Sequence, residues 1–231
     1  MKHDIVFILQ NDYKRDEIIY SIRSICENFP YRKIWIYGGV PENILPDCVV
    51  PFEQKGVNKW ERVNHTLRAI CKNDEITPDF WLFNDDFFIM KKVRKMDTMI
   101  DGTLWARANR ISERYAGRDS NYSKMLKETA RVLRDRGYDR LNYALHVPML
   151  INREKGLETL KEFKGYPMFR SLYGNHHKIK AVMADDVKIM DLLYKPTGKE
   201  KFISTDDKCF DEGLTGEYIR QAFPDKCKYE L

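Results

Sequence analysis

Two adjacent carboxylates stand between apolar runs in the segment FWLFNDDFFI, residues 80–89. Asp85 and Asp86 follow a predicted buried strand, and no lysine or arginine follows them until Lys91. Neighbouring carboxylates repel each other and are costly to desolvate, and a bound divalent cation removes that cost. Mg²⁺ and Mn²⁺ prefer oxygen ligands and need only one or two protein carboxylates when phosphates and water supply the others. The pair is therefore a candidate metal site for a diphosphate; the alternative is a pair that caps a turn or a helix start.

The position of this acidic pair distinguishes it from two others in the chain. Asp185-Asp186 and Asp206-Asp207 are predicted to be turn or surface acids. Asp85-Asp86 instead comes at the carboxyl end of a predicted strand, where open α/β sheets bind their ligands. We therefore expect the ligand-binding edge of the fold at this point.

Strands and helices are predicted to alternate up to the acidic pair. Short apolar runs indicate strands, and apolar residues at helical spacing indicate helices. The predicted strands cover residues 4–9, 33–37, 48–52 and 80–83, and the predicted helices cover 16–27 and about 59–71. Such alternation favours an α/β fold with a mostly parallel sheet flanked by helices.

The pattern changes to charged helices over residues 91–140, which we interpret as a basic helical insertion. This segment has 14 Lys and Arg against 7 Asp and Glu, whereas the whole chain has a net charge of +5. Four of its arginines would share one helix face, at positions 107, 110, 114 and 118. That face is either a platform for an anionic acceptor or a solvated surface. Strand-like patterning resumes at 143–151 and again at 180–189.

Length and composition indicate one folded domain, residues 1–231, with the insertion inside it. The 231 residues are 43 % hydrophobic and 13 % aromatic, which excludes an intrinsically disordered chain. No run reaches the roughly 18 apolar residues of a membrane span, and no signal segment is evident, so a cytoplasmic protein is expected. The five cysteines are far apart and lack metal-site spacing, so reduced thiols are expected. The oligomeric state stays open.

Several segments resemble the Stealth family of sugar-phosphate transferases. The most specific are DEIIYSIRSI at residues 16–25, YRKIWIYGGVP at 31–41 and FWLFNDDFFI at 80–89, in the family's order and spacing. HDIVFILQNDY at 3–13, LHVPMLINREKG at 145–156 and FRSLYGN at 169–175 are similar more weakly. The resemblance implies a Rossmann-like glycosyltransferase fold of the GT-A type. In that fold an acidic motif holds Mn²⁺ or Mg²⁺ on the diphosphate of a nucleotide-sugar donor, here most simply of the UDP type.

The same resemblance implies roles for the residues of the acidic motif. Asp86 corresponds to the main metal ligand and Asp85 to a second one. Asn84 is placed against the metal, the ribose or the substrate. Asn11 and Asp12 are placed near the nucleotide.

Two further active-site candidates follow from the weaker segments, His146 and Arg170. An imidazole titrates near neutral pH and suits a general base, although it also serves as a metal ligand. An arginine suits a bidentate clamp on phosphate. From its apolar context alone, His146 also fits a hydrogen-bonded core histidine.

Three functions are compatible with these patterns. The first is a metal-dependent transferase that moves a glycosyl group, or a sugar 1-phosphate, from a nucleotide sugar to a saccharide hydroxyl. The second uses the same donor site but glycosylates hydroxylated bases in DNA, which would explain the basic insertion. The third is a non-enzymatic module that binds nucleic acid through the Arg-rich helices, with a structural acidic pair.

Overall fold

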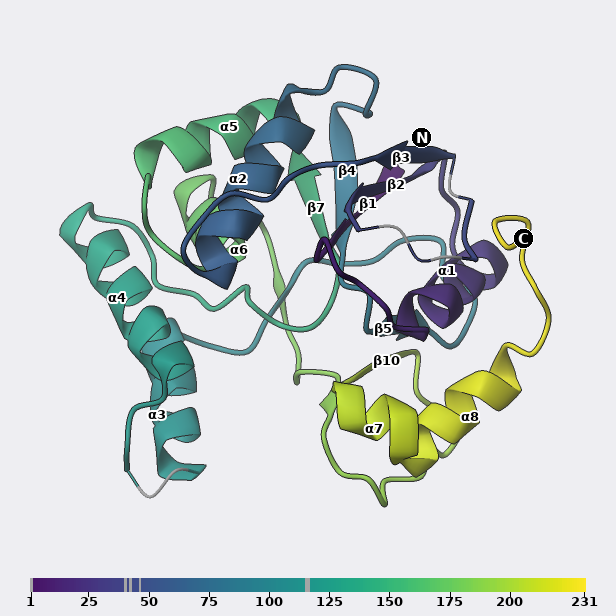
Figure 1. Ribbon diagram of the computed structural model, residues 1–231. Coiled ribbons are helices and arrows are strands. Elements are labelled where there is room, and N and C mark those ends of the chain that lie inside the picture. The colour runs from purple at the N-terminus through teal and green to yellow at the C-terminus, as the bar shows by residue number, and fades with distance from the viewer. Residues whose placement is uncertain (1, 40, 42, 46, 115–116) are drawn as a thin grey trace.

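The central element of the protein is a five-stranded sheet with strand order β3-β2-β1-β4-β7 (Figure 1). The computed structural model describes residues 2–39, 41, 43–45, 47–114 and 117–231. The first four strands of this order run parallel, and β7 pairs antiparallel with β4. The predicted mostly parallel α/β sheet is therefore confirmed. Its strands are β1 (Asp4–Leu9), β2 (Ile34–Gly38), β3 (Cys48–Val50), β4 (Asp79–Phe83) and β7 (Met149–Asn152).

Helices cover both faces of this sheet because its strands are apolar on both sides. In β1, the fully buried Phe7 belongs to the apolar cluster of helix α1, whereas the equally buried Val6 belongs to the cluster of α2. Successive side chains of a strand point to opposite faces, so a continuous apolar run needs cover on each side. One face carries α1 (Glu17–Asn28), and the other carries α2 (Lys59–Lys72), α5 (Arg153–Glu162) and α6 (Phe169–His176).

The carboxyl ends of β1 and β2 come close together at a pair of glycines. Gly38 has a φ of +107°, and a Cβ there would lie 2.0 Å from the carbonyl oxygen of Leu9. A Cβ on Gly39 would lie 2.2 Å from the carbonyl oxygen of Gln10. Only glycine fits this close approach of two backbones, so the pair allows the ends of β1 and β2 to lie side by side at the sheet edge.

The basic segment contains a helical hairpin beside the sheet. Leu104 and Ala108 of its first helix pack against Leu126 and Ala130 of its second, and all four are buried. Figure 1 shows the hairpin on the left, extending away from the sheet. Its elements are α3 (Leu104–Arg114) and α4 (Asn121–Asp135), preceded by the short strand β6 (Met99–Ile100).

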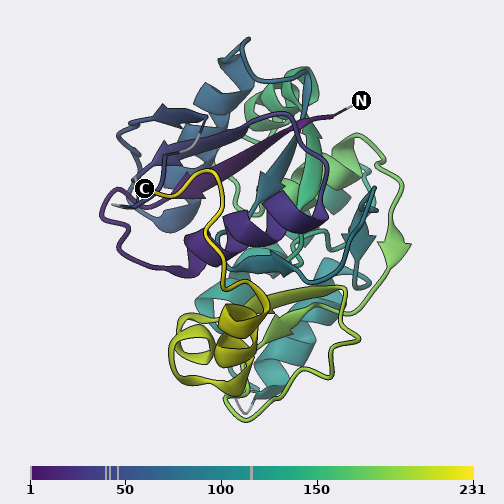
Figure 2. The ribbon, with the colours of Figure 1, turned by 90° about the vertical axis from the view of Figure 1, so that its right-hand side faces the viewer.

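A smaller lobe follows the acidic motif and lies below the central sheet in Figure 2. Phe88 and Ile203 on its strands pack against Phe210 and Ile219 on its helices. Its sheet has the order β5-β10-β9, with β5 (Phe87–Ile89), β9 (Lys188–Ile189) and β10 (Phe202–Thr205). Its helices are α7 (Asp207–Glu212) and α8 (Leu214–Ala222). The turn at residues 84–86 therefore passes directly from the central sheet into this second one.

The strand expected over 180–189 is present as two separate short strands. Strand β8 (Val182–Met183) pairs with β6, whereas β9 pairs with β10. The residues between them, 184–187, leave one sheet and enter another. This break places Asp186 and Lys188 beside the central sheet.

Two smaller sequence predictions concern membranes and cysteines. No helix in the described part of the chain is both long and apolar enough to span a bilayer. Cys26, Cys71, Cys209 and Cys227 form no disulfide among the described residues. The side chain of Cys48 lies outside the described residues.

Candidate functional site

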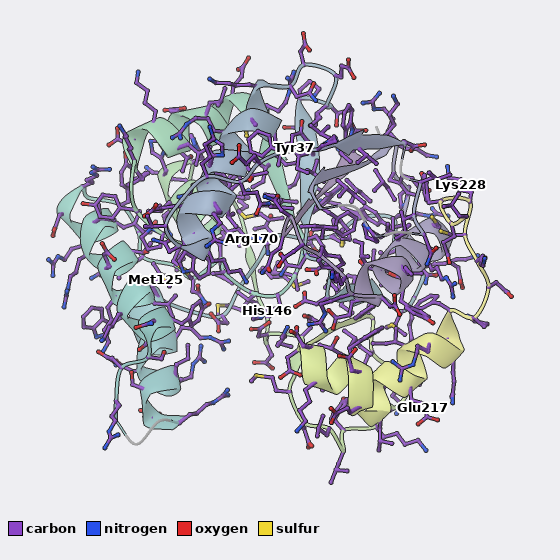
Figure 3. The ribbon with its side chains drawn as sticks, in the orientation of Figure 1. Tyr37, Met125, His146, Arg170, Glu217 and Lys228 are labelled. Carbon is purple, nitrogen blue, oxygen red and sulfur yellow. The ribbon has the colours of Figure 1, made fainter. Side chains whose placement is uncertain are left out.

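A cavity of about 380 Å³ opens at the carboxyl ends of β1 and β4. Side chains from α2, α4, α6 and the segment before β7 close around it. Figure 3 shows His146 and Arg170 near the middle of the molecule, between the sheet, the hairpin and the smaller lobe. Among the polar side chains that line the cavity are those of Asn84, Asp85, Asp86, His146, Arg170 and Lys188.

Asp86 has one oxygen paired and one oxygen unpaired. Its Oδ2 accepts a hydrogen bond from Lys188 Nζ at 2.6 Å, and the same ammonium also donates to the backbone oxygen of Thr205. Its Oδ1 is buried and has no hydrogen-bond partner among the described residues. Buried carboxylate oxygens in folded proteins nearly always have partners, so this oxygen is available to accept one more ligand.

Two more acids lie close to Asp86. Burial and the charge of Asp86 raise the pKa of Asp85. Glu17, at the start of α1, is only 1 % exposed, and burial raises its pKa to about 8. The Arg15 guanidinium, 3.1 Å away, opposes this shift, and the charges of Asp85 and Asp86 add to it. Burial and the charge of Asp85 likewise raise the pKa of Tyr13. The site therefore concentrates negative charge, and protons or cations relieve it.

Sequence reasoning did not identify Glu17 or Lys188 as site residues. Glu17 belongs to the DE pair that opens the predicted helix 16–27, and an acidic residue in the first turn of a helix is ordinarily explained by the helix dipole. Lys188 is more than 100 positions from Asp86. The Stealth-like DEIIYSIRSI segment was the available signal for Glu17.

Arg170 connects the end of β4 to the segment before β7. Its Nη1 donates to the backbone oxygens of Leu145 and Val147, at 3.0 and 2.6 Å. Its Nη2 donates to Asn84 Oδ1 at 2.8 Å and to the backbone oxygen of Leu82 at 3.3 Å. Burial lowers the pKa of Arg170 to about 10, so it remains charged at neutral pH.

The four hydrogen bonds of Arg170 use all four N–H groups of its two Nη atoms. The N–H groups expected to clamp a phosphate therefore already donate to protein oxygens. Arg170 can act on a ligand in the cavity through its positive charge. No carboxylate of the described residues forms an ion pair with it. Asn84 is held through its Oδ1 by the same guanidinium.

His146 forms a dyad with Asp186. His146 Nδ1 lies 3.0 Å from Asp186 Oδ2 and 3.2 Å from Oδ1, and its backbone N–H donates to Oδ1 at 3.0 Å. Burial opposes ionisation of Asp186, but the hydrogen bonds from His146 and the charge of Arg107 outweigh it and lower the pKa to about 2. Because an ionised Asp186 can only accept hydrogen bonds, Nδ1 of His146 carries the proton and its Nε2 is an acceptor. The prediction that Asp186 is a turn or surface acid is wrong, whereas Asp185 is exposed.

Two arginines of the expected basic face are engaged in this network. Arg107 Nη2 donates to Asp186 Oδ2 at 2.9 Å, and its Nη1 donates to Asp101 Oδ2 at 3.2 Å. Arg110 Nη2 donates to the same Asp101 oxygen at 2.9 Å, while Asn142 Nδ2 donates to Oδ1 at 2.6 Å. Helix α3 therefore supports the dyad, and these two arginines are not a free binding platform.

An aromatic pair forms another wall of the cavity. Trp60 of α2 and Tyr122 of α4 stack with ring centroids 6.3 Å apart and an interplanar angle of 28°. Burial raises the pKa of Tyr122 to about 12, which keeps its hydroxyl neutral. The two residues are 62 positions apart, so no local sequence pattern predicts that they stack. The pair suits contact with the face of a ligand ring.

Asn11 and Asp12 occupy the turn that follows β1. Both are exposed, and Tyr13 closes the turn through its backbone N–H to the oxygen of Gln10 at 3.1 Å. Neither side chain lines the described cavity. Their expected role toward a nucleotide therefore stays a prediction.

The donor set bears on the expected metal. No group of three His, Cys, Asp or Glu side chains among the described residues is arranged to hold a metal ion. Mg²⁺ and Mn²⁺ sites that take phosphate and water ligands need fewer protein ligands than three. The unpaired Asp86 Oδ1 and the neighbouring Asp85 fit that kind of site.

Comparisons with protein-family models and with curated proteins give no match. Among solved structures, the chain is similar to galactosyltransferase LgtC, with 12 % identity, a TM-score of 0.45 and coverage of 97 % of this chain and 98 % of that one. Mouse xyloside xylosyltransferase 1 follows, with 9 % identity, a TM-score of 0.42 and coverage of 90 % and 98 %. The glycosyltransferase GlyE of Streptococcus pneumoniae has 10 % identity, a TM-score of 0.35 and coverage of 97 % and 50 %. These likenesses are distant, and the strand order itself establishes an α/β protein with a mainly parallel sheet flanked by helices.

Proposed function

We propose that this protein is a metal-dependent glycosyltransferase that uses a nucleotide sugar, of the UDP type, and a saccharide hydroxyl as acceptor. The observation that carries the proposal is the buried, unpaired Oδ1 of Asp86 at the carboxyl edge of a parallel sheet. This edge is where α/β sheets bind nucleotides, and the cavity beside it has the polar and apolar walls of a small-molecule site. The Stealth-like segments, which include this acidic motif, support the same proposal.

Asp86 and Asp85 would hold the divalent ion, Mn²⁺ or Mg²⁺. When bound, the ion supplies Lewis-acid stabilisation of the diphosphate that leaves the sugar. The chain adds fixed positive charge at the same place, since Lys188 lies 2.6 Å from Asp86 and Arg170 lines the cavity. Charges that are held in position before the reaction stabilise the developing phosphate charge without reorganisation.

His146 is the proposed general base. Asp186 holds the proton on Nδ1, so Nε2 is available to take the proton of the acceptor hydroxyl. The hydroxyl oxygen then bonds to the anomeric carbon as the bond from that carbon to the diphosphate oxygen breaks. The electron pair of the broken bond goes to the diphosphate, where Lys188 and Arg170 offset its charge. The Trp60–Tyr122 wall suits the sugar ring.

Transfer of a sugar 1-phosphate is the second reaction that the same donor site supports. The Stealth-like segments favour this reaction. In it the acceptor oxygen would attack the phosphorus that carries the sugar, and a nucleoside monophosphate would leave. The DNA-acceptor hypothesis gains nothing from Arg107 and Arg110, because both pair with carboxylates. The nucleotide product distinguishes glycosyl transfer from sugar 1-phosphate transfer.

The experiment is a hydrolysis screen of nucleotide sugars with Mn²⁺ or Mg²⁺, since slow donor breakdown needs no acceptor. We expect one UDP-sugar to be hydrolysed, with UDP as product for glycosyl transfer and UMP for sugar-phosphate transfer. Asp86→Asn is expected to abolish hydrolysis, whereas Asp185→Asn, an exposed acid, retains it. No hydrolysis of any nucleotide sugar with either metal, together with no donor binding, would overturn the proposal.

A further inference from the structure

A second cavity, of about 300 Å³, lies on the helical hairpin. It is formed by the first turn of α3, the later turns of α4 and the segment that follows α4. It shares no lining residue with the candidate active site. Its lining residues are Thr103, Trp105, Ala130, Arg131, Arg134 and Arg140.

The charges in this cavity are all positive. Arg131 and Arg140 form no ion pair with the described residues, and both are exposed. Arg134 pairs only with its exposed neighbour Asp135, at 2.8 Å. The first turn of α3 adds the positive end of its helix dipole. This arrangement differs from that of Arg107, which is held between two carboxylates.

Trp105 provides an apolar surface at the same place. Its side chain is 43 % exposed, which is unusual for so large an apolar residue. The Arg131 guanidinium lies 5.9 Å from the centroid of its ring, and the Lys127 ammonium, which pairs with Asp119 at 2.7 Å, lies 5.7 Å from it. An exposed indole flanked by cations suits a ligand that has both a flat ring face and an anionic group.

We infer that this cavity binds an anionic sugar residue of the acceptor chain, through its carboxylate or phosphate. The assignment to an acceptor rests on the proposed function. Tyr122 of the active-site cavity and Arg131 lie on the same helix, ~14 Å apart along its axis at 1.5 Å per residue and about half a turn apart around it. An acceptor that occupies both cavities would have to be several sugars long and pass around α4, with its reactive hydroxyl at His146.

A glycan fits this cavity better than a nucleic acid. Proteins that hold single-stranded nucleic acid use a row of stacking aromatics along a continuous basic groove. Here a single exposed indole lies in one confined cavity. The two arginines nearest the candidate dyad, Arg107 and Arg110, are occupied by Asp101 and Asp186.

The test is calorimetric titration of the whole chain, without donor or metal, using a hyaluronan hexasaccharide as the acidic glycan. The comparison probes are neutral maltohexaose and a ten-nucleotide oligothymidylate. We expect the acidic hexasaccharide to bind at least tenfold more tightly than maltohexaose. Arg131→Gln/Arg140→Gln should weaken that binding at least tenfold, and the equally charged control Lys91→Gln/Lys92→Gln should change it less than twofold. All four positions are exposed, so the variants are expected to fold, and circular dichroism verifies this.

The inference is overturned if the acidic hexasaccharide does not bind, or if both double variants weaken it equally. Tighter binding of the oligothymidylate than of the hexasaccharide would overturn it in favour of nucleic acid. Because this titration contains no nucleotide sugar, its outcome is independent of the hydrolysis screen. If the hexasaccharide does not bind, the proposed donor site is unaffected. If the hydrolysis screen fails, the hexasaccharide titration can still be interpreted.

Discussion

The buried carboxyl of Glu17 makes stability depend on pH near neutrality. Burial raises its pKa from an ordinary 4.5 to about 8, so the folded protein favours the protonated form. A group whose pKa is higher in the folded than in the unfolded state stabilises the folded state fully when the pH is below the unfolded-state pKa. That stabilisation is lost as the pH rises toward the folded-state pKa. We therefore expect Glu17→Gln, which keeps the shape and cannot ionise, to become increasingly more stable than the wild type as the pH rises.

The size of this effect follows from the shift. One pH unit inside the window between the two pKa values changes the free energy of unfolding by about 1.4 kcal/mol. Between pH 5 and pH 7 the stability difference between Glu17→Gln and the wild type should thus grow by ~2.7 kcal/mol. Above pH 8 the growth stops, because Glu17 is then ionised in both states. The charges of Asp85 and Asp86 contribute to the shift, so the measurement also reports on the acidic site.

The assay is urea denaturation followed by tryptophan fluorescence at pH 5, 6, 7 and 9. Glu27→Gln is the matched control, because Glu27 is an exposed residue at the other end of the same helix. Its stability difference from the wild type should stay constant over the same range. A constant difference for Glu17→Gln as well would show that Glu17 ionises like a surface acid, and the reasoning about this site would be wrong.

Two more substitutions test the roles of Asp186 and Arg170. Asp186→Asn should lower kcat by about 10²–10⁴-fold with little change in KM, since it removes the group that orients the proposed base. The control Asp185→Asn should leave kcat nearly unchanged. An equal loss of kcat in both variants would contradict the His146–Asp186 dyad. Arg170→Met should lower the free energy of unfolding in urea by about 3–5 kcal/mol, because it leaves four acceptors without a charged donor. A loss below about 1 kcal/mol would show that Arg170 does not hold the end of β4.

The position of the acidic motif was predictable because it depends on local patterns. An apolar run followed at once by two carboxylates identifies a strand end, and the alternation before it identifies a parallel sheet. The structure places Asp85 and Asp86 after β4, in the cavity at that edge. The extent of β7 was less predictable: strand patterning covered 143–151, whereas the strand starts at Met149 and His146 lies in the segment before it.

The partners of these residues were not predictable, since they come from distant parts of the chain. Asp186 is 40 residues from His146, and Lys188 is 102 residues from Asp86. A single sequence contains no local pattern that brings such pairs together. The arginine face was predicted from helical spacing alone, which does not show that Asp101 would neutralise part of it.

If the acidic pair holds a cation on a nucleotide diphosphate, the affinity for UDP must depend on Mn²⁺. In the wild type we expect Mn²⁺ to tighten UDP binding at least tenfold in calorimetric titration. In Asp86→Asn this gain should disappear, while Asp185→Asn should keep it. UDP binding that is equally tight without Mn²⁺, or a full Mn²⁺ effect in Asp86→Asn, would contradict the claim.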